Sequence, residues 1–317
     1  MKDTTIPALS RLLLPVRDLD LFHNTLPLVE LVSNTIGGDI EKLELLHIIG
    51  GSFLSTHLNN IAFRAGHVLS SDLMKRLREQ HYKEFVNPLL ARVQELLSQS
   101  GVGLQPKVRV EDGDPINKIV SICEQEKFST LILSRRKRTG ESIIAETLLN
   151  GILQEFLDAS IYIIGEDGLP ESKNPASRII VGIDGSAASL RAAREAAIFL
   201  TRVAKEVEEV SLVNVRDPSC FLDDTGMSCK KASDIGYSYL KEAEDLLINE
   251  GVDASKIVTI LLFGRPAQAL TEYAQKFDAT MCYVGRRDRS KISEIILGSI
   301  CADIIQRCRK TTLVLVS

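Results

Sequence analysis

Three short segments in the last part of the chain have residue types that occur in ligand-binding sites. Asp184 follows an apolar run and precedes a Gly-Ser pair, Gly285 ends another apolar run, and Gly298 and Ser299 come after a charged spacer. A glycine at the end of a strand lets the backbone approach a phosphate. A helix that begins at Ser299 would offer unpaired N–H groups, a hydroxyl and the positive end of its dipole. The spacing therefore predicts a phosphate-binding site.

Apolar runs of strand length alternate with helical patterns around these segments. We expect strands at 178–184, 210–215, 256–262, 280–284 and 312–316, and helices at about 190–204, 232–250, 266–276 and 299–307. Strands that are apolar throughout and alternate with helices favour a doubly wound parallel sheet covered on both faces. Such sheets bind ligands at the carboxyl ends of their strands. Asp184, Gly285 and Ser299 are all expected at that edge.

The first half of the chain repeats this pattern. The segment around Gly113 matches the segment around Gly264 at an offset of 151 residues, and the same register places 160–164 against 311–315. Upstream the offset is 167, so the first copy carries 16 extra residues. Repetition of a whole α/β unit predicts two five-stranded, doubly wound domains in one chain.

The stretch between the copies, 165–178, is rich in Gly, Pro, Ser and charge, which is typical of a solvated linker. We expect one domain over 1–166 and a second over 177–317. The extra residues of the first copy begin at Gly51 and are expected to form a longer helical cover that is broken near Pro88.

The two copies resemble the universal stress protein family in its tandem-domain form. A V-x-I-D-x-S pattern at 181–186, a Gly-x-Pro turn at 264–266 and the glycine pattern that ends in Gly298-Ser299 carry the resemblance. It implies a Rossmann-like fold of the adenine-nucleotide alpha-hydrolase type. It also implies that the second copy binds AMP, ADP or ATP, with Mg²⁺ only alongside ATP. By this resemblance the residues expected to contact the nucleotide are Asp184, Val213, Gly285, Arg286, Gly298, Ser299 and Ile300.

The second copy departs from the family pattern at one position. Asp288 replaces the middle glycine and adds an anion beside the expected phosphates. Arg286, Arg287 and Arg289 flank it and could offset its charge by pairing with Asp288 or with phosphate. We therefore expect AMP or ADP to be tolerated better than ATP.

The first copy departs further. Arg17 stands where Asp184 stands in the second copy, Ser134 and Lys137 replace two glycines, and Thr147-Leu148 replaces the Gly-Ser pair. A fold can persist when its site is lost. We interpret the first copy as a degenerate partner domain.

Composition narrows the function classes. The net charge is −4 with charges well mixed, no apolar run is long enough to span a membrane, and the N-terminus shows no signal-peptide pattern. We expect a cytoplasmic protein that binds neither nucleic acid nor a membrane. None of the six cysteines forms a CxxC pair, and we expect them to be reduced and mostly buried.

The sequence contains none of the common catalytic signatures, such as GxSxG or a P-loop. The five histidines all lie in the first copy and match no zinc-ligand spacing. We expect no dedicated catalyst and no protein metal site; slow, incidental ATP hydrolysis stays open.

Two hypotheses from different classes remain. In the first, the protein is a stress-response regulator whose C-terminal nucleotide shifts a conformation that an unknown protein partner reads. In the second, it is a ligand-free scaffold whose contact surface is the loop at 216–231 and the insertion of the first copy. In either case we expect the apolar runs 161–164 and 313–316 to pair edge to edge as an intramolecular pseudo-dimer, because pairing hides two sheet edges. A further homodimer through the insertion stays open.

Overall fold

The computed structural model describes residues 8–50, 71–135, 143–155, 157–166, 168, 174–219, 227–286 and 299–317. The described elements before residue 165 are β1 (Arg11–Pro15), α1 (Leu19–Ile36), η1 (Gly37–Asp39), β2 (Lys42–Ile49), α3 (Ser71–His81), η2 (Tyr82–Val86), α4 (Asn87–Gln99), β3 (Lys107–Asp112), α5 (Pro115–Gln125), β4 (Thr130–Ser134), α6 (Ile143–Gln154) and β5 (Ser160–Ile164). Those after it are β6 (Arg178–Gly182), α7 (Ala187–Arg202), β7 (Glu209–Arg216), α8 (Met227–Asn249), η4 (Ala254–Lys256), β8 (Ile257–Phe263), α9 (Pro266–Phe277), β9 (Met281–Gly285), α10 (Ser299–Arg307) and β10 (Thr312–Val316).

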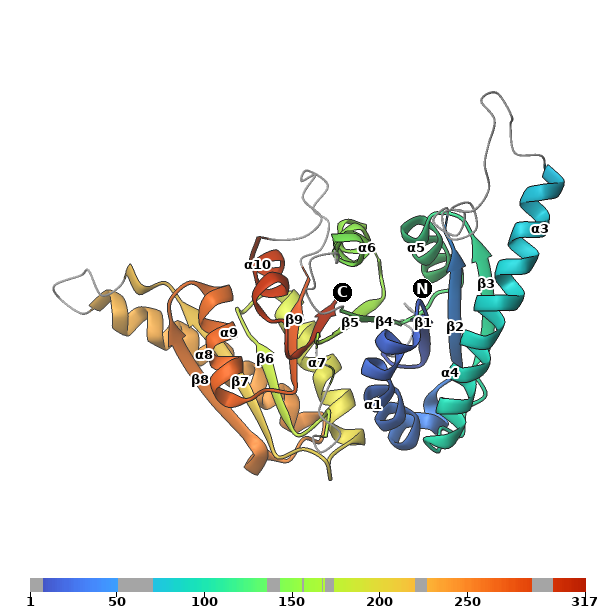
Figure 1. Cartoon of the computed structure of the whole chain (residues 1–317). Coiled ribbons are helices and arrows are strands. Elements are labelled where there is room, and N and C mark those ends of the chain that lie inside the picture. The colour runs from blue at the N-terminus through green and yellow to red at the C-terminus, as the bar shows by residue number, and fades with distance from the viewer. Residues whose placement is uncertain are drawn as a thin grey trace, which may run out of the picture.

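The described strands form one ten-stranded sheet in the order β3-β2-β1-β4-β5-β10-β9-β6-β7-β8 (Figure 1). Neighbouring strands are parallel except β5 and β10, which run antiparallel. The predicted α/β class with a mainly parallel sheet is confirmed. Each expected strand of the second half lies within two residues of its observed bounds, because runs that are buried on both faces are apolar throughout.

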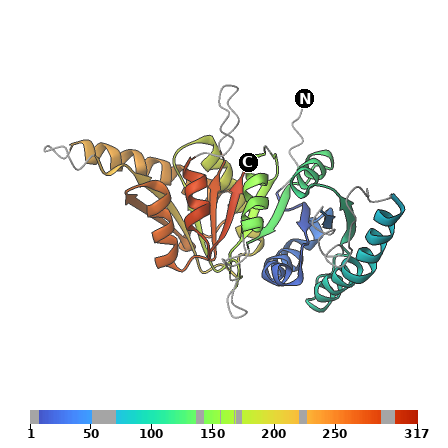
Figure 2. The ribbon, with the colours of Figure 1, turned by 45° about the horizontal axis from the view of Figure 1, so that its top comes forward.

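Helices cover both faces of this sheet. One buried apolar cluster joins the sheet to α1, α4, α7 and α8, and a second joins its other face to α5, α6, α9 and α10. Both clusters contain residues from both halves of the chain, for example Leu28 and Phe199 on one face and Ile152 and Ile304 on the other. Each cluster therefore extends across the junction between the two halves, which lie side by side in Figure 2.

The predicted break near Pro88 is wrong. The chain continues from α3 through a π-helical turn, Tyr82–Val86, into α4, where Pro88 occupies the first turn. The N–H of Asn87 reaches back to the carbonyl of Tyr82, which is the wide spacing of a π turn. A proline in the first turn needs no N–H partner, so the wide turn accommodates it without ending the helix.

The two halves meet at the pairing of β5 with β10. Leu313 lies opposite Ile163, Leu315 lies opposite Ile161, and Val314 faces Tyr162 at the centre. The expected edge-to-edge pairing of these two runs is confirmed. The repeat alignment that places 160–164 against 311–315 is off by one residue for these strands. Thr130 pairs with Ser160, whereas the counterpart of Thr130, Met281, pairs with Thr312.

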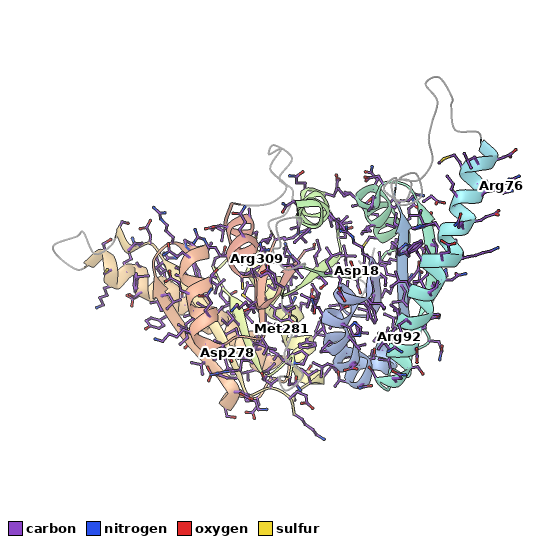
Figure 3. All side chains as sticks on the ribbon, viewed as in Figure 1. Asp18, Arg76, Arg92, Asp278, Met281 and Arg309 are labelled. Carbon is purple, nitrogen blue, oxygen red and sulfur yellow. The ribbon has the colours of Figure 1, made fainter. Side chains whose placement is uncertain are left out.

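Two buried arginines are exchanged across this junction. Arg135 Nη1 donates to the carbonyl of Cys308 at 3.1 Å, and Arg286 Nη2 donates to the carbonyl of Leu157 at 2.8 Å. Arg135 and Arg286 are equivalent positions of the repeat, so the contact is reciprocal, as in a two-fold symmetric interface. Arg309, labelled near the middle of the molecule in Figure 3, adds an ion pair to Glu166 of the first half.

A buried polar cluster also bridges the halves. Glu195 of α7 accepts hydrogen bonds from Ser160 Oγ at 2.5 Å and from Tyr162 Oη at 3.0 Å, both on β5. Burial raises the pKa of Glu195 to about 7, although the two hydroxyl donors act in the opposite direction. The Tyr162 ring meets Tyr283 edge to face at 6.2 Å. The junction therefore contains a carboxyl group whose buried state favours the proton.

The expectation that all cysteines are reduced is wrong. Cys229, in the first turn of α8, is disulfide-bonded. Cys123, Cys282, Cys301 and Cys308 are free and buried, as expected. Sequence spacing misses a bond of this kind because it depends on which cysteines the fold brings together.

We predict that Glu195 makes stability fall as pH rises. Below pH 4.5 the carboxyl is protonated in both states; as pH rises towards about 7 the unfolded form ionises while the folded form keeps its proton. Denaturant titrations from pH 4.5 to above 7 should show wild type losing about 1–3 kcal/mol relative to Glu195→Gln across this window. The control Glu242→Gln, on the exposed face of α8, should follow wild type. Identical pH profiles for wild type and Glu195→Gln would contradict the prediction.

Candidate functional site

A cavity opens in the second half where the strand order reverses. The chain runs from β6 outward to β7 and β8, then returns to place β9 on the other side of β6. The cavity lies at the carboxyl ends of β6, β7 and β9 and is closed laterally by α9, α10 and the first turn of α7. Its volume is about 130 Å³. This is where open α/β sheets bind ligands.

Asp184 lies at the rim of this cavity, as predicted. It follows the end of β6, and its Oδ1 accepts the N–H of Ser186 at 2.9 Å. Ser186 in turn caps α7 by accepting the N–H of Ser189 at 3.1 Å. The Asp-Gly-Ser sequence thus folds into a tight turn that is fixed to the start of α7 and leaves the carboxylate exposed at the rim.

Val213 lines the cavity, but its backbone is not available to a ligand. The carbonyl of Val213 accepts the N–H of Ile183 at 2.8 Å. Residues two apart on a strand direct their backbone groups to the same side, and the pairing of β6 with β7 ends at Gly182. Val215 therefore presents its backbone beyond the end of β6, where it lines the cavity. The sequence prediction named Val213 and missed Val215. The feature of the sequence that could have indicated Val215 is that the apolar run of β7 continues beyond Val213.

Gly285 ends β9 and lines the cavity beside the start of α7. A Cβ atom at this position would overlap the carbonyl oxygen of Ala188 and lie 2.7 Å from the nitrogen of Ser189. Glycine is required here because β9 packs directly against the first turn of α7. The predicted role of Gly285, which was close approach of a ligand phosphate, is thus joined by a packing role that the sequence pattern does not reveal.

Arg286 is not at the cavity, contrary to prediction. Its side chain is 6% exposed and crosses the junction to the carbonyl of Leu157. Burial lowers the pKa of this guanidinium, while Cys301 and Asp158 favour its charged form. The arginine that was expected to hold phosphate instead connects the two halves.

The described part of α10 runs from Ser299 to Arg307, within the helix expected there, and its residues Ile300, Cys301 and Ile304 line the cavity. Cys301 Sγ lies 3.7 Å from the carbonyl oxygen of Gly285. The described N-terminal part of α10 therefore lies beside the end of β9 at the cavity. Gly298 and Asp288, and the side chain of Ser299, lie outside the described residues.

The remaining walls are aliphatic. They come from Val213, Val215, Leu270, Val284 and Ile304, with Pro266 at the start of α9. A cavity with apolar walls, one carboxylate at its rim and a helix N-terminus at its mouth suits a flat aromatic ring joined to a polar or anionic group. The Gly-x-Pro motif supplies α9, which the sequence placed correctly but did not identify as a wall of the site.

The equivalent region of the first half shares its backbone arrangement. His47 Nδ1 lies 2.8 Å from the carbonyl of Val16. At the equivalent position of the second half, Asn214 Nδ2 lies 2.6 Å from the carbonyl of Ile183. Burial lowers the pKa of His47, and its bond to Val16 opposes this. Arg17 is exposed where Asp184 stands in the second half. Lys137 and the side chain of Thr147 lie outside the described residues.

The cavity falls within the part of the chain that is similar to a known family. Residues 175–316 match the sequence model of the universal stress protein family. Universal stress protein MJ0531 of Methanocaldococcus jannaschii is 28% identical over 162 residues, which are 48% of this chain and 89% of that protein. Universal stress protein YxiE of Bacillus subtilis is 28% identical over 145 residues, or 41% of this chain and 92% of that protein.

A universal stress protein structure from Archaeoglobus fulgidus superposes with a TM-score of 0.64 at 19% identity, over 98% of each chain. The whole chain therefore shares the fold of that structure, and the second half carries the family similarity in sequence.

The described residues contain no group of three or more His, Cys, Asp or Glu side chains that could hold a metal ion. None of the helices among them is long and apolar enough to cross a bilayer.

We predict that Gly285→Ala destabilises the protein by about 2 kcal/mol or more, because the new methyl group must displace the first turn of α7. Gly37→Ala is the control, since a Cβ at Gly37 has no neighbour within 4 Å and the residue has helical dihedral angles. Urea unfolding of both variants measures the difference. Equal stability of Gly285→Ala and wild type would show that β9 and α7 are not packed this closely.

Proposed function

We propose that the domain at 177–317 binds an adenine nucleotide in the cavity at the carboxyl ends of β6, β7 and β9. The observation that carries the proposal is that an apolar cavity and a helix N-terminus occur together at the strand reversal, within the residues that match the universal stress protein model. Ligand sites are commonly apolar cavities with a few polar groups that fix orientation.

The base is assigned to the aliphatic part of the cavity. Val215 and Leu270 suit the faces of a purine, and the backbone of Val215 offers an N–H and a carbonyl to its edge. Asp184 adds a carboxylate at the same rim, which has lone pairs beyond the one that accepts the Ser186 N–H. Together these groups can distinguish an amino-substituted ring from other flat rings.

The phosphate end is assigned to the first turn of α10. Helix N-termini bind anions through unpaired N–H groups and the helix dipole. Asp184 lies at the same rim and repels additional negative charge, while Arg286 is committed to the junction. This balance favours AMP or ADP over ATP, and Mg²⁺ would enter only with ATP.

We propose binding without dedicated catalysis. Asp184 is the only carboxylate among the cavity-lining residues that the structure describes, and the turn at Ser186 already holds it. Hydrolysis of a nucleotide would need a base placed against an attacking water. The described lining contains no histidine to share that role.

We further infer that the chain is a tandem of two universal stress protein-like domains, at 1–166 and 177–317, joined as an intramolecular pseudo-dimer that acts in a stress response. The reciprocal bonds of Arg135 and Arg286 support this organisation. Because Gly285 lines the cavity and Arg286 follows it, a ligand that favours one arrangement of this strand end would shift the contact with the first half. An unknown protein partner would read that shift.

One observation favours the alternative, a ligand-free scaffold of the same fold. Arg286, the cation that was expected to hold phosphate, is buried in the junction and does not line the cavity. In that case the residues that frame the cavity would serve packing, as Gly285 does.

The first test is to denature the purified protein, identify any released nucleotide by chromatography, and titrate adenosine, AMP, ADP and ATP by calorimetry. We expect binding by wild type, a loss of about tenfold or more in affinity for Asp184→Ala, and no change for Arg17→Ala, the matched position in the first half. No released nucleotide and no heat with any of the four would overturn nucleotide binding and leave the scaffold. Equal loss in both variants would show that the effect is not specific to the cavity.

A further inference from the structure

The described sheet has two outer strands, β3 at one end and β8 at the other (Figure 1). They are equivalent strands of the repeat, since β3 pairs with β2 as β8 pairs with β7. An outer strand offers unpaired backbone groups to another chain, and proteins commonly protect such strands with charged side chains. The two outer strands differ sharply in this respect.

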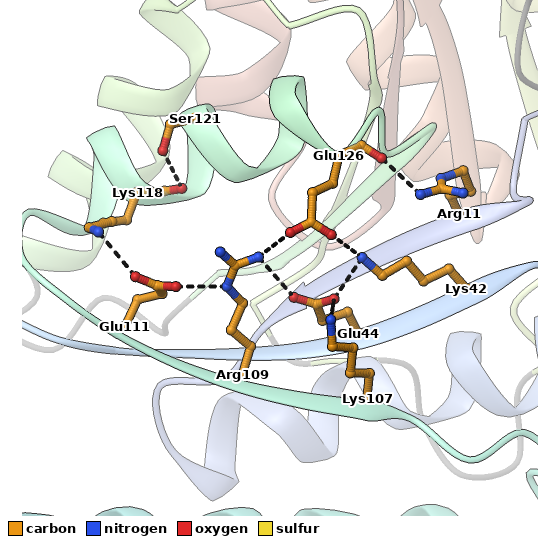
Figure 4. Close-up of polar contacts among 9 residues, drawn as sticks. All are labelled: Arg11, Lys42, Glu44, Lys107, Arg109, Glu111, Lys118, Ser121 and Glu126. Atoms are coloured by element: carbon orange, nitrogen blue, oxygen red, sulfur yellow. Dashed lines mark hydrogen bonds and ion pairs between the residues drawn. The ribbon is translucent and has the colours of Figure 1, made fainter.

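The β3 strand is protected by charge. Lys107, Arg109 and Glu111 alternate along it on one face and enter a network of ion pairs (Figure 4). Arg109 Nε lies 2.8 Å from Glu111, and Lys118 Nζ lies 3.0 Å from the same carboxylate. Glu44 is fully buried beneath them and forms ion pairs with Lys107 at 3.9 Å and with Arg109 at 3.6 Å. Another strand that docked on this edge would have to disturb these pairs.

The same three positions in β8 are apolar. Val258, Ile260 and Leu262 stand where β3 carries Lys107, Arg109 and Glu111. Val258 is 37% exposed, and Ile260 and Leu262 are only partly buried against the core. The whole strand, IVTILLF, has no charged residue and no proline.

In composition β8 resembles the strands that pair at the internal junction. The segments SIYII of β5 and TLVLV of β10 also lack charge, and they meet antiparallel about a central pair. Within this molecule, the uncharged edges of β5 and β10 are paired, whereas the charged edge of β3 ends the sheet. By the same rule, β8 is suited to pairing.

The direction of the backbone groups fits an antiparallel partner. The N–H of Gly264 donates to Arg216 of β7 at 2.9 Å, so even-numbered residues of β8 face β7. Thr259 and Leu261, the odd-numbered residues at the centre of the strand, therefore direct their N–H and carbonyl groups outward. Two such strands related by a two-fold axis at Ile260 would place Thr259 of each opposite Leu261 of the other.

We propose that β8 is a docking edge for a second copy of this chain, with the two β8 strands paired antiparallel about Ile260. This register aligns Val258 with Leu262 of the other copy and Ile260 with its own counterpart, so that half-exposed apolar side chains cover each other. It also brings exposed Arg265, just beyond one end of the strand, towards exposed Asp253 before the other end. Opposite charges at the two ends select the antiparallel arrangement and a second copy as the occupant.

The test is sedimentation of the full chain over ~1–100 µM, where specific dimers of moderate affinity form. We expect wild type to dimerise, and Val258→Lys with Leu262→Glu to raise the dissociation constant at least ~10-fold, because these changes copy the charges of β3. The first half already folds with lysine and glutamate at these positions, so the variant should keep its circular dichroism spectrum. Phe85→Lys, which alters a 47% exposed aromatic residue on η2, is the matched control and should dimerise like wild type.

A cysteine at the axis tests the register independently. Ile260→Cys should give a covalent dimer under oxidising conditions that thiol reagents reverse, because residues directly opposite in an antiparallel pair are close enough for a disulfide. Ile248→Cys, at a 38% exposed site on α8, should not. A wild-type protein that stays monomeric over the whole range would overturn the proposal. So would a dimer that resists the two charges on β8, or one that Phe85→Lys disrupts.

Discussion

The antiparallel pairing of β5 with β10 is the contact on which the rest of the structure depends. Each half is a parallel sheet whose last strand is uncharged and apolar on both faces, so neither edge could remain exposed at low cost. Pairing turns the two sheets into one and lets a single core run along each face. The halves are thereby joined by backbone hydrogen bonds and by continuous apolar packing, and not by the linker alone.

This junction also determines which side chains are available to line the cavity. A buried guanidinium is costly to desolvate, and here one nitrogen of Arg135 and one of Arg286 offset part of that cost by donating to a carbonyl in the opposite half. Arg286 follows Gly285, which lines the cavity. One short segment therefore serves both the ligand site and the interface, and in this chain its arginine serves the interface. Among the described residues, no arginine or lysine lines the cavity.

The two halves have equivalent strand orders, but side chains of different types occupy equivalent positions. Glu195 bonds to Ser160 and Tyr162 on one side of the junction, whereas its counterpart in the repeat is Leu28, within the apolar core. On the outer strands the asymmetry is reversed, with charge on β3 and aliphatic residues on β8. The equivalent hydrogen bonds of His47 and Asn214 occur in both halves, while the side chains at other equivalent positions differ.

The sequence by itself determined the strands of the second half and the pairing of β5 with β10, because each depends on local apolar runs or edge composition. It could not determine where Arg286 points or whether Val213 or Val215 faces the cavity. Those depend on where β6 ends relative to β7 and on which carbonyl lies across the junction. The continuous helix at Pro88 and the packing need for Gly285 were likewise decided by tertiary contacts, since a π turn and a close approach to Ala188 have no local sequence signal.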